Sequence, residues 1–260
     1  MTFPPGQSRQ GRAGQAVADR IVARGEAHVW WWRVPERTDP ADLALLSTDE
    51  FHRALCMLAE RNAAEFVGTR ARARRALAAL LQIQPTGVEL GRRCCPGCGS
   101  SGHGPPQLTR PALPLAISLS RTAGWGILAV GAGASVGVDA EALRPVHESL
   151  YAGSVLTDTE RRHLDAAPPG EARHRAFHRV WTRKESVVKA VGVGLAGTDL
   201  DRLDTRPGER GPIGLTHHGA DGTTEWTVED LHLCEDLAVS LARPQGPASR
   251  GRVHLHPPTD

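Results

Sequence analysis

Lysine is almost absent from this chain of 260 residues: Lys184 and Lys189 are the only lysines among its 31 Lys and Arg side chains. Long apolar runs are absent too, because no stretch approaches the roughly 18 consecutive apolar residues of a membrane span. The first 25 residues are polar and contain no apolar signal core. These absences predict a soluble, cytoplasmic protein with no membrane partner.

Charge of one sign is not in excess either. The formal net charge is +2, which gives no whole-molecule argument for binding nucleic acid. The five cysteines are an odd number, so they do not indicate the disulfide framework of a small secreted protein. The cysteine content therefore agrees with the expected cytoplasmic location.

Three cysteines and one histidine lie close together within residues 84–112, which read as a loop. Cys95-x-x-Cys98 followed by His103 supplies half of a zinc site, because a structural site needs a fourth Cys or His ligand. Cys94 could complete the set only with awkward geometry, since it adjoins Cys95. Zinc binding stays open at this point.

The pattern of strands and helices predicts an α+β fold. Residues 27–34, with three consecutive tryptophans, read as a buried strand. Ser47 with Glu50 forms a capping box that opens a helical region, and Thr157 with Glu160 forms another before a short helix. Further strands are expected at 115–119, 124–130, 136–141, 225–233 and 236–242. We expect four regions: a disordered leader (1–25), an N-terminal half (26–114), a C-terminal half with a metal site (115–242) and a disordered tail (243–260).

Both lysines lie on a predicted helix that ends at Val191, before Gly192 and Gly194. On a helix, Trp181, Glu185 and Lys189 share one face, with Lys184 beside them. The plainest interpretation is a solvated Glu–Lys face with a core tryptophan. A second group of charged residues, upstream in the sequence, argues instead for a functional site.

That group is Asp139 and Glu141, which project from the same face of a strand because they are two residues apart. Together with Glu185 they would make an oxygen-rich site. Such a donor set suits Mg²⁺ better than a soft metal.

The order and spacing of these elements resemble a known pair of motifs. Gly137-Val-Asp139-Ala-Glu141, then Trp181-x-x-Lys184-Glu185-Ser-x-x-Lys189 followed by Gly192-x-Gly194, resembles the signature of the 4′-phosphopantetheinyl transferase superfamily. The length and the segment 117–122 point to its single-chain, Sfp-type branch. The resemblance covers about residues 27–242. It implies two similar α/β halves that form an intramolecular pseudo-dimer, with coenzyme A in the cleft between them.

The resemblance also implies roles for single residues. Asp139, Glu141 and Glu185 would hold Mg²⁺ against the pyrophosphate of coenzyme A. Lys189 would contact the phosphates, and Lys184 would be a neighbouring structural or phosphate-binding cation. Glu185 would take the proton of the attacking serine, directly or through a water. The implied partners are coenzyme A and an acyl or peptidyl carrier protein, the implied state is a monomer, and the implied product is 3′,5′-ADP.

The chain departs from the family pattern at two places. The family's Ser-His-Ser/Thr element, which meets a phosphate of coenzyme A, is Ser120-Arg121-Thr122 here. Arg121 keeps a cationic donor with a different reach. The family's Gly-basic-Pro element is Gly104-Pro105-Pro106, without the basic residue, and Arg53 or Arg110 would have to replace that contact.

Two other hypotheses compete with a transferase that serves polyketide or non-ribosomal peptide synthesis. One is a non-catalytic homologue that binds coenzyme A or a carrier protein, and the retained acids and lysines argue against it. The other is a zinc-containing module that binds nucleic acid through the arginine-rich helix near residues 70–75. The near-neutral net charge and the incomplete zinc ligand set argue against that hypothesis.

Overall fold

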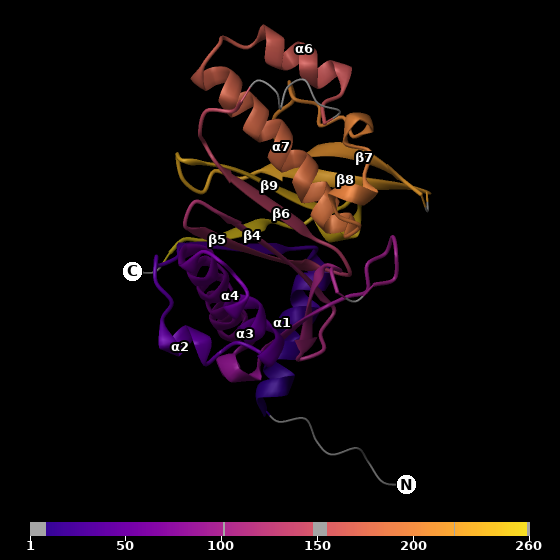
Figure 1. Cartoon of the computed structure of the whole chain (residues 1–260). Coiled ribbons are helices and arrows are strands. Elements are labelled where there is room, and N and C mark those ends of the chain that lie inside the picture. Colours follow the sequence, from indigo (N-terminus) through magenta and orange to yellow (C-terminus); the bar gives the residue numbers. More distant parts are fainter. Residues whose placement is uncertain (1–8, 101, 148–154, 221, 259–260) are drawn as a thin grey trace.

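The computed structural model describes residues 9–100, 102–147, 155–220 and 222–258. Helices and strands follow one another in separate runs along the chain, an α+β arrangement (Figure 1), which confirms the predicted fold class. The helices are α1 (Arg9–Arg24), α2 (Pro40–Leu43), α3 (Thr48–Leu55), α4 (Glu60–Leu81), α6 (Asp158–Ala166) and α7 (Glu171–Val191). In the part of the chain that is described, no helix is long and apolar enough to cross a membrane.

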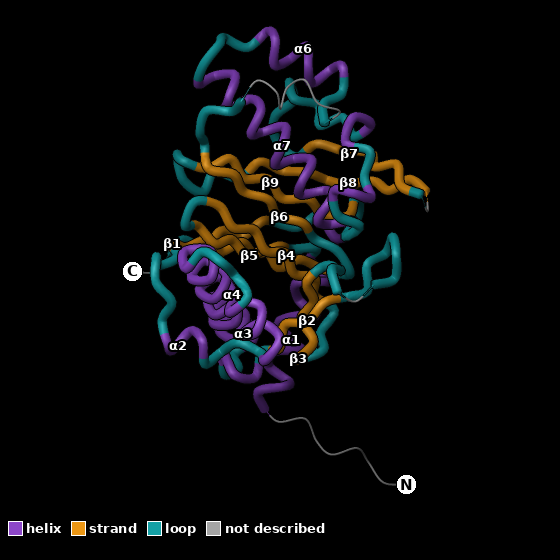
Figure 2. The backbone as a smooth tube through the Cα atoms, in the orientation of Figure 1, coloured by secondary structure: helices purple, strands orange, loops and turns teal. Residues whose placement is uncertain are grey.

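The strands form two sheets of four strands and one two-stranded ribbon (Figure 2). One sheet has the order β10-β1-β5-β4, the other β6-β9-β8-β7, and β2 pairs with β3. The strands are β1 (Ala27–Arg33), β2 (Glu89–Arg92), β3 (Pro106–Arg110), β4 (Leu115–Thr122), β5 (Trp125–Ala132), β6 (Gly137–Ala142), β7 (Ile213–Gly219), β8 (Gly222–Asp230), β9 (Leu237–Pro244) and β10 (Val253–His256). The internal two-fold relation implied by the resemblance stays a prediction.

The predicted strand with three tryptophans is β1. Its successive side chains pack into two different hydrophobic cores. Trp32 packs with residues of α1 and α4, such as Ile21 and Leu77. Trp31, on the opposite face, packs with Val138 of β6 and other residues of the second sheet. Successive side chains of a strand point to opposite faces, so β1 is buried on both sides.

The two sheets meet at their edge strands, β4 and β6, through side-chain hydroxyls. Ser118, Ser120 and Thr122 of β4 accept hydrogen bonds from the backbone N–H groups of Val138, Ala140 and Ala142. The three donor–acceptor distances are 3.0, 3.2 and 3.1 Å. The hydroxyls of β4 thus satisfy the free N–H groups of a neighbouring sheet edge, which would otherwise be buried without partners.

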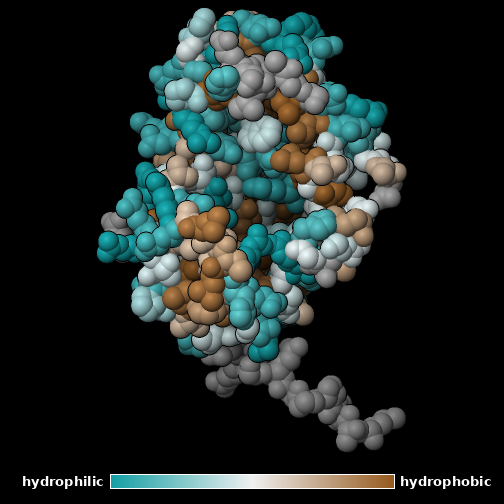
Figure 3. All heavy atoms as spheres, in the orientation of Figure 1, coloured by the Kyte–Doolittle hydropathy of each residue, from teal (hydrophilic) through white to brown (hydrophobic). Residues whose placement is uncertain are grey.

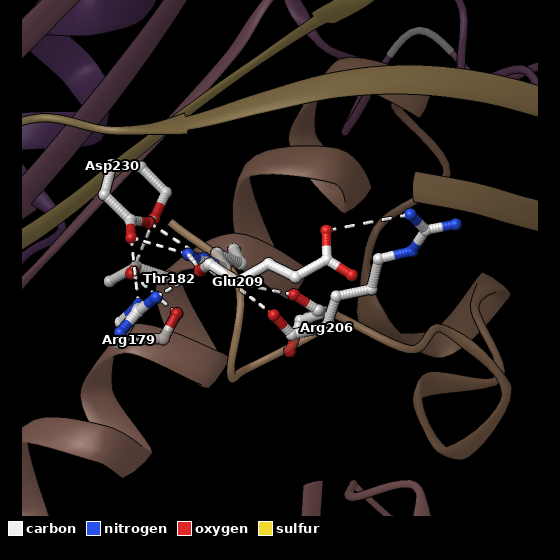
Figure 4. Close-up of polar contacts among 8 residues, drawn as sticks. Arg179, Thr182, Arg206, Glu209 and Asp230 are labelled. Carbon is white, nitrogen blue, oxygen red and sulfur yellow. Dashed lines mark hydrogen bonds and ion pairs between the residues drawn. The ribbon is translucent and has the colours of Figure 1, made fainter. Parts of the chain in front are cut away.

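Helix α7 lies across the second sheet and is fixed to it by a buried arginine. Arg183 donates to both carboxylate oxygens of Asp230, at 2.9 and 2.7 Å, and its remaining N–H groups donate to carbonyl oxygens of Thr205, Arg206 and Glu209. Arg179 also contacts Asp230 (Figure 4). All donors of this fork are used, so Arg183 is a structural residue.

A second buried cation ties α7 to α6. Lys184 is fully buried, lies 2.8 Å from Glu160, and donates to the carbonyl oxygens of Leu200 and Leu203. Glu160 also accepts from the backbone and hydroxyl of Thr205 and completes the predicted capping box at the start of α6. Every hydrogen-bonding group of this ion pair therefore finds a partner.

The predicted disordered ends are wrong for most of their length. Residues 9–24 form α1, which buries Val17, Ala18 and Ile21 in the first core. Residues 253–256 form β10, which pairs in parallel with β1. α1 is polar in composition and β10 has only four residues. Both are stabilised by packing against distant parts of the chain, so local patterns did not reveal them. Residues 1–8 and 259–260 of these predictions lie outside the described residues.

The predicted boundary between halves, at residues 114 and 115, also disagrees with the sheets. β4 and β5 belong to the sheet of β1, and the second sheet begins with β6 at Gly137. The division between the sheets therefore falls between residues 132 and 137. The predicted loop at 84–112 contains the ribbon of β2 and β3, which lies outside both larger sheets.

Replacing Lys184 by Met should lower the free energy of unfolding by about 3–5 kcal/mol, because the carboxylate of Glu160 would stay buried without its partner. Urea unfolding measures this. The matched control is Arg175→Met on the same helix, where an exposed pair with Glu171 is lost at a cost of about 1 kcal/mol or less. Equal effects of the two substitutions would contradict the structural role of Lys184.

Replacing Asp230 by Asn should lower stability by about 1.5–3 kcal/mol near neutral pH, since charge-assisted hydrogen bonds are lost. Burial raises the pKa of Asp230, but the hydrogen bonds and charge of Arg183, with the charge of Arg179, outweigh burial and lower it overall. The stabilisation is present above the unfolded-state pKa of about 3.9 and is lost as pH falls through the lower folded pKa. The difference in unfolding free energy between wild type and variant should therefore shrink on acidification, and a constant difference would count against this account.

Candidate active site

A cavity of about 520 Å³ opens between the two sheets. The two four-stranded sheets, each with the helices packed on it, form two parts of the molecule. Figure 3 shows hydrophilic side chains around a hollow between these two parts. Elements of both parts contribute to its walls: α3, α4, β2 and β4 on one side, and β6 and α7 on the other. Among the lining residues are Arg53, Phe66, Arg70, Arg92, His103, Ser120, Arg121, Asp139, Glu141, Trp181, Glu185 and Lys189.

One wall is acidic, with a single lysine. Asp139 lies on β6, and its Oδ1 is 2.6 Å from the Nζ of Lys189 on α7. Ser120 connects the two: its hydroxyl accepts from Lys189 at 3.0 Å and donates to Asp139 Oδ1 at 3.1 Å. Thr122 donates to Glu141 at 3.4 Å. The hydroxyls that join the two sheets thus also hold the acids of β6 in place.

The carboxylates of this wall are desolvated and repel one another. Burial raises the pKa of Glu185 to about 7, and the negative charge of Asp139 adds to the effect while Lys189 opposes it. Burial and the charge of Asp139 also raise the pKa of Glu141. One ammonium group faces three carboxyl groups, so this wall favours a further cation.

A hard divalent cation fits the donor set. Oδ2 of Asp139 is buried without a hydrogen-bond partner, and carboxylate oxygens are preferred ligands of Mg²⁺. The described structure does not gather the ligand oxygens of Asp139, Glu141 and Glu185 within 4.8 Å of one another. Binding one ion through all three acids would require the glutamate side chains to turn toward Asp139.

The opposite wall carries arginines around one aromatic ring. The guanidinium groups of Arg53, Arg70 and Arg121 lie 5.5, 5.6 and 5.5 Å from the ring centroid of Phe66. Burial lowers the pKa of Arg70 to about 10 and also lowers the pKa of Arg121. Arginine stays protonated under such shifts, so the wall presents fixed positive charge to an anionic ligand.

Most of the predicted site residues meet at this cavity. Arg53, Ser120, Arg121, Asp139, Glu141, Glu185 and Lys189 line it, and Thr122 holds Glu141. Trp181 and Glu185 lie on the same face of α7 as Lys189, as the helical spacing predicted.

Of the two roles predicted for Lys184, structural or phosphate-binding, the structure supports the structural one, and Lys184 does not line the cavity as a contact for coenzyme A. Its ammonium group is buried against Glu160, since neighbouring residues of a helix point about 100° apart and Glu185 takes the direction of the cavity. Arg110 does not replace the missing basic residue either. It pairs with Glu89 and is absent from the cavity lining.

Two arginines of the cavity were not predicted as site residues. Arg70 was one of several arginines on its helix that nothing local distinguished. Arg74 and Arg75 pair with Glu50 and Asp42, and Arg70 lies 3.6 Å from Glu50 but also lines the cavity. Arg92 lies at the end of β2 and donates to the carbonyl oxygen of Gly104 at 2.9 Å. No sequence signal marked Arg92, because it meets residues 104–106 only through the pairing of β2 with β3.

The C-terminal end of α7 packs against residues 104–106, the segment that differs from the family's pattern. Gly192 caps the helix with φ of 89°, and a Cβ there would lie 2.9 Å from Cγ of Pro105. Only glycine allows both the left-handed conformation and this approach without displacement. Residues 104–106 therefore form a wall of the cavity although they lack the basic side chain.

Comparison with known proteins identifies a family. The model of the 4′-phosphopantetheinyl transferase superfamily matches residues 135–242, which begin near β6 and end in β9. An L-aminoadipate-semialdehyde dehydrogenase-phosphopantetheinyl transferase of Eremothecium gossypii is 31% identical over 235 residues, covering 84% of this chain and 82% of that protein. The 4′-phosphopantetheinyl transferase HetI of Nostoc sp. is 26% identical over 190 residues, covering 71% and 76%.

The similarity extends over most of both chains in the first of these comparisons, and the two sequence motifs converge on one cleft. The predicted family is thereby confirmed: the chain is an enzyme of the 4′-phosphopantetheinyl transferase superfamily.

Proposed function

We propose that this enzyme transfers the 4′-phosphopantetheine arm of coenzyme A to a serine of an acyl or peptidyl carrier protein, in a Mg²⁺-dependent reaction and as a monomer. The observation that carries the proposal is the pair of opposed walls in one cavity, arginines on one side and carboxylates with Lys189 on the other. A ligand with several phosphates and a bound cation matches both walls.

The reaction needs an activated hydroxyl and a stabilised leaving group. The serine oxygen forms a bond to the phosphorus that carries the pantetheine arm, the bond from that phosphorus to the bridging oxygen breaks, and 3′,5′-ADP leaves. The serine proton passes to Glu185, directly or through a water. Glu185 lines the cavity, and a carboxylate placed beside the attacking hydroxyl can accept its proton.

Asp139, Glu141 and Glu185 would hold the Mg²⁺ ion. When bound, the ion supplies positive charge to the pyrophosphate oxygens, where charge develops during phosphoryl transfer. Lys189 contributes a second positive charge from the same wall, and Ser120 keeps its ammonium group beside Asp139.

The arginine wall would bind the remaining phosphates. Arg53, Arg70, Arg92 and Arg121 line one side of the cavity, and guanidinium groups form paired hydrogen bonds with phosphate oxygens. Arg70 and Arg92 are the candidates to replace the basic residue that is missing at Pro105. Arg121 would take the role of the histidine in the family's pattern.

The carrier protein is the less defined substrate. We propose a carrier of polyketide or non-ribosomal peptide synthesis. The name of the Eremothecium relative favours a second candidate, a carrier domain of an aminoadipate-semialdehyde dehydrogenase. A non-catalytic homologue is disfavoured because the acids and Lys189 converge on the cavity.

Replacing Glu185 by Gln should lower the rate of transfer by about 10²-fold or more, because the proton acceptor and one metal ligand are lost. The assay is the intact mass of an apo carrier protein after incubation with the enzyme, coenzyme A and Mg²⁺. The wild type should add one phosphopantetheine unit, EDTA should prevent it, and excess Mg²⁺ should restore it. Transfer in EDTA, or an active variant, would refute the roles given to Mg²⁺ and Glu185. No transfer to peptidyl, acyl and dehydrogenase-borne carriers, despite binding of coenzyme A, would support the non-catalytic hypothesis.

Replacing Arg121 by Ala should raise the KM for coenzyme A about 10- to 100-fold, since a charge-assisted hydrogen bond contributes about 1.5–3 kcal/mol. The matched control is Arg110→Ala, an arginine outside the cavity that pairs with Glu89. Steady-state kinetics at saturating carrier protein distinguish them. If both variants keep the wild-type KM, the arginine wall does not bind coenzyme A as proposed.

A further inference from the structure

The loop between β2 and β3 brings together three groups that bind soft metals. The Sγ atoms of Cys95 and Cys98 and a ring nitrogen of His103 all lie within 4.8 Å of one another. Cys98 Sγ and His103 Nε2 are 3.1 Å apart. The proposed transfer reaction uses none of these three side chains.

The backbone around Cys95 forms a closed turn. The N–H groups of Cys98 and Gly97 donate to its sulfur. The turn is closed by hydrogen bonds from Gly99 N–H to the carbonyl oxygen of Cys95 and from Cys95 N–H to that of Ser100, both 2.8 Å. Gly99 has φ of 73°, which glycine adopts readily. The turn keeps the sulfur atoms of Cys95 and Cys98 close together, and cysteines bind metals as thiolates.

We propose that Cys95, Cys98 and His103 bind a zinc ion. Two thiolates and one imidazole are a ligand set typical of zinc, and they fit it better than Mg²⁺, which prefers oxygen. With ordinary zinc–ligand distances and tetrahedral angles, a sulfur and a nitrogen ligand lie about 3.5 Å apart. The observed 3.1 Å therefore needs only a small opening. Cys98 and His103 are exposed, which leaves a fourth position for water.

The ion would fix a loop that spans the two parts of the molecule. The neck of the loop is closed by Arg93 N–H, which donates to the carbonyl oxygen of Pro105 at 2.9 Å. Farther out, a Cβ on Gly97 would lie 3.5 Å from Val193, just beyond the end of α7. The loop that starts in the first part therefore packs on the helix that carries Glu185 and Lys189.

His103 connects the zinc site to the cleft, because it lines the cavity together with Gly104 and Pro105. Zinc would hold this wall in place, in the segment that lacks the basic residue of the family's pattern. Its effect on coenzyme A binding rests on the proposed function, whereas the metal site itself does not.

Metal content of the full-length protein tests the site. Protein incubated with one equivalent of Zn²⁺ and then gel-filtered should retain about one zinc per chain by mass spectrometry. The Cys95→Ser and Cys98→Ser variants should lose it, while Cys56→Ser, an exposed cysteine elsewhere, should keep it. Co²⁺ in place of zinc should give thiolate-to-metal charge-transfer absorption in the wild type and not in the Cys95→Ser variant. A zinc-free wild type, or a disulfide between Cys95 and Cys98 in its place, would overturn the proposal.

Kinetics separate this proposal from the proposed function. Removal of zinc by a chelator, followed by excess Mg²⁺, should raise the KM for coenzyme A about tenfold or more, with a smaller change in kcat, because a displaced wall misplaces the substrate. Re-addition of Zn²⁺ should reverse the change. Zinc binding without any transfer activity would leave the metal site standing and refute the transferase. Normal kinetics of a zinc-free enzyme would refute the role of zinc in the cleft.

Discussion

The joint between the two sheets depends on three hydroxyl groups. β4 and β6 are edge strands, and each would expose unpaired backbone groups if the sheets separated. Ser118, Ser120 and Thr122 accept the N–H groups of β6 in place of backbone carbonyls. Because side chains replace a ladder of backbone bonds, the sheets remain separate and a cleft can form beside the joint. The same hydroxyls orient Asp139 and Glu141, so the contact that assembles the fold also assembles the acidic wall.

The cleft keeps opposite charges apart. Arginines gather around Phe66 on one wall, carboxyl groups on the other, and Lys189 bridges to Asp139. Burial makes each wall unfavourable by itself: it raises the pKa of Glu185 and Glu141 and lowers that of Arg70. A ligand that brings phosphates to one wall and a cation to the other would relieve both penalties. This separation of charge is the physical basis for the proposal that the site binds an anion and a metal together.

Neighbouring residues of helix α7 have different roles: some attach the helix to the fold, and others line the cleft. Arg183 and Lys184 point away from the cleft and bind Asp230 and Glu160, which fixes the helix to β8 and α6. Glu185, the next residue, points into the cleft. The rotation of about 100° per residue accounts for this change of role. A rigid attachment on one side gives the reacting groups on the other side a fixed position.

The sequence by itself determined the α+β class, the strands β1, β4, β5 and β6, both capping boxes and the family, because these depend on local spacing. It also predicted that Asp139, Glu141, Glu185 and Lys189 lie together, and all four line one cavity, since periods of two and of 3.6 residues define a face without knowledge of the fold. Only the tertiary structure decided that α1 and β10 are ordered, that Lys184 is buried with Glu160, and that Arg70 and Arg92 reach the cleft rather than solvent. These outcomes depend on partners far away in the chain, and a local pattern contains no record of which buried carboxylate or free sheet edge a given side chain will meet.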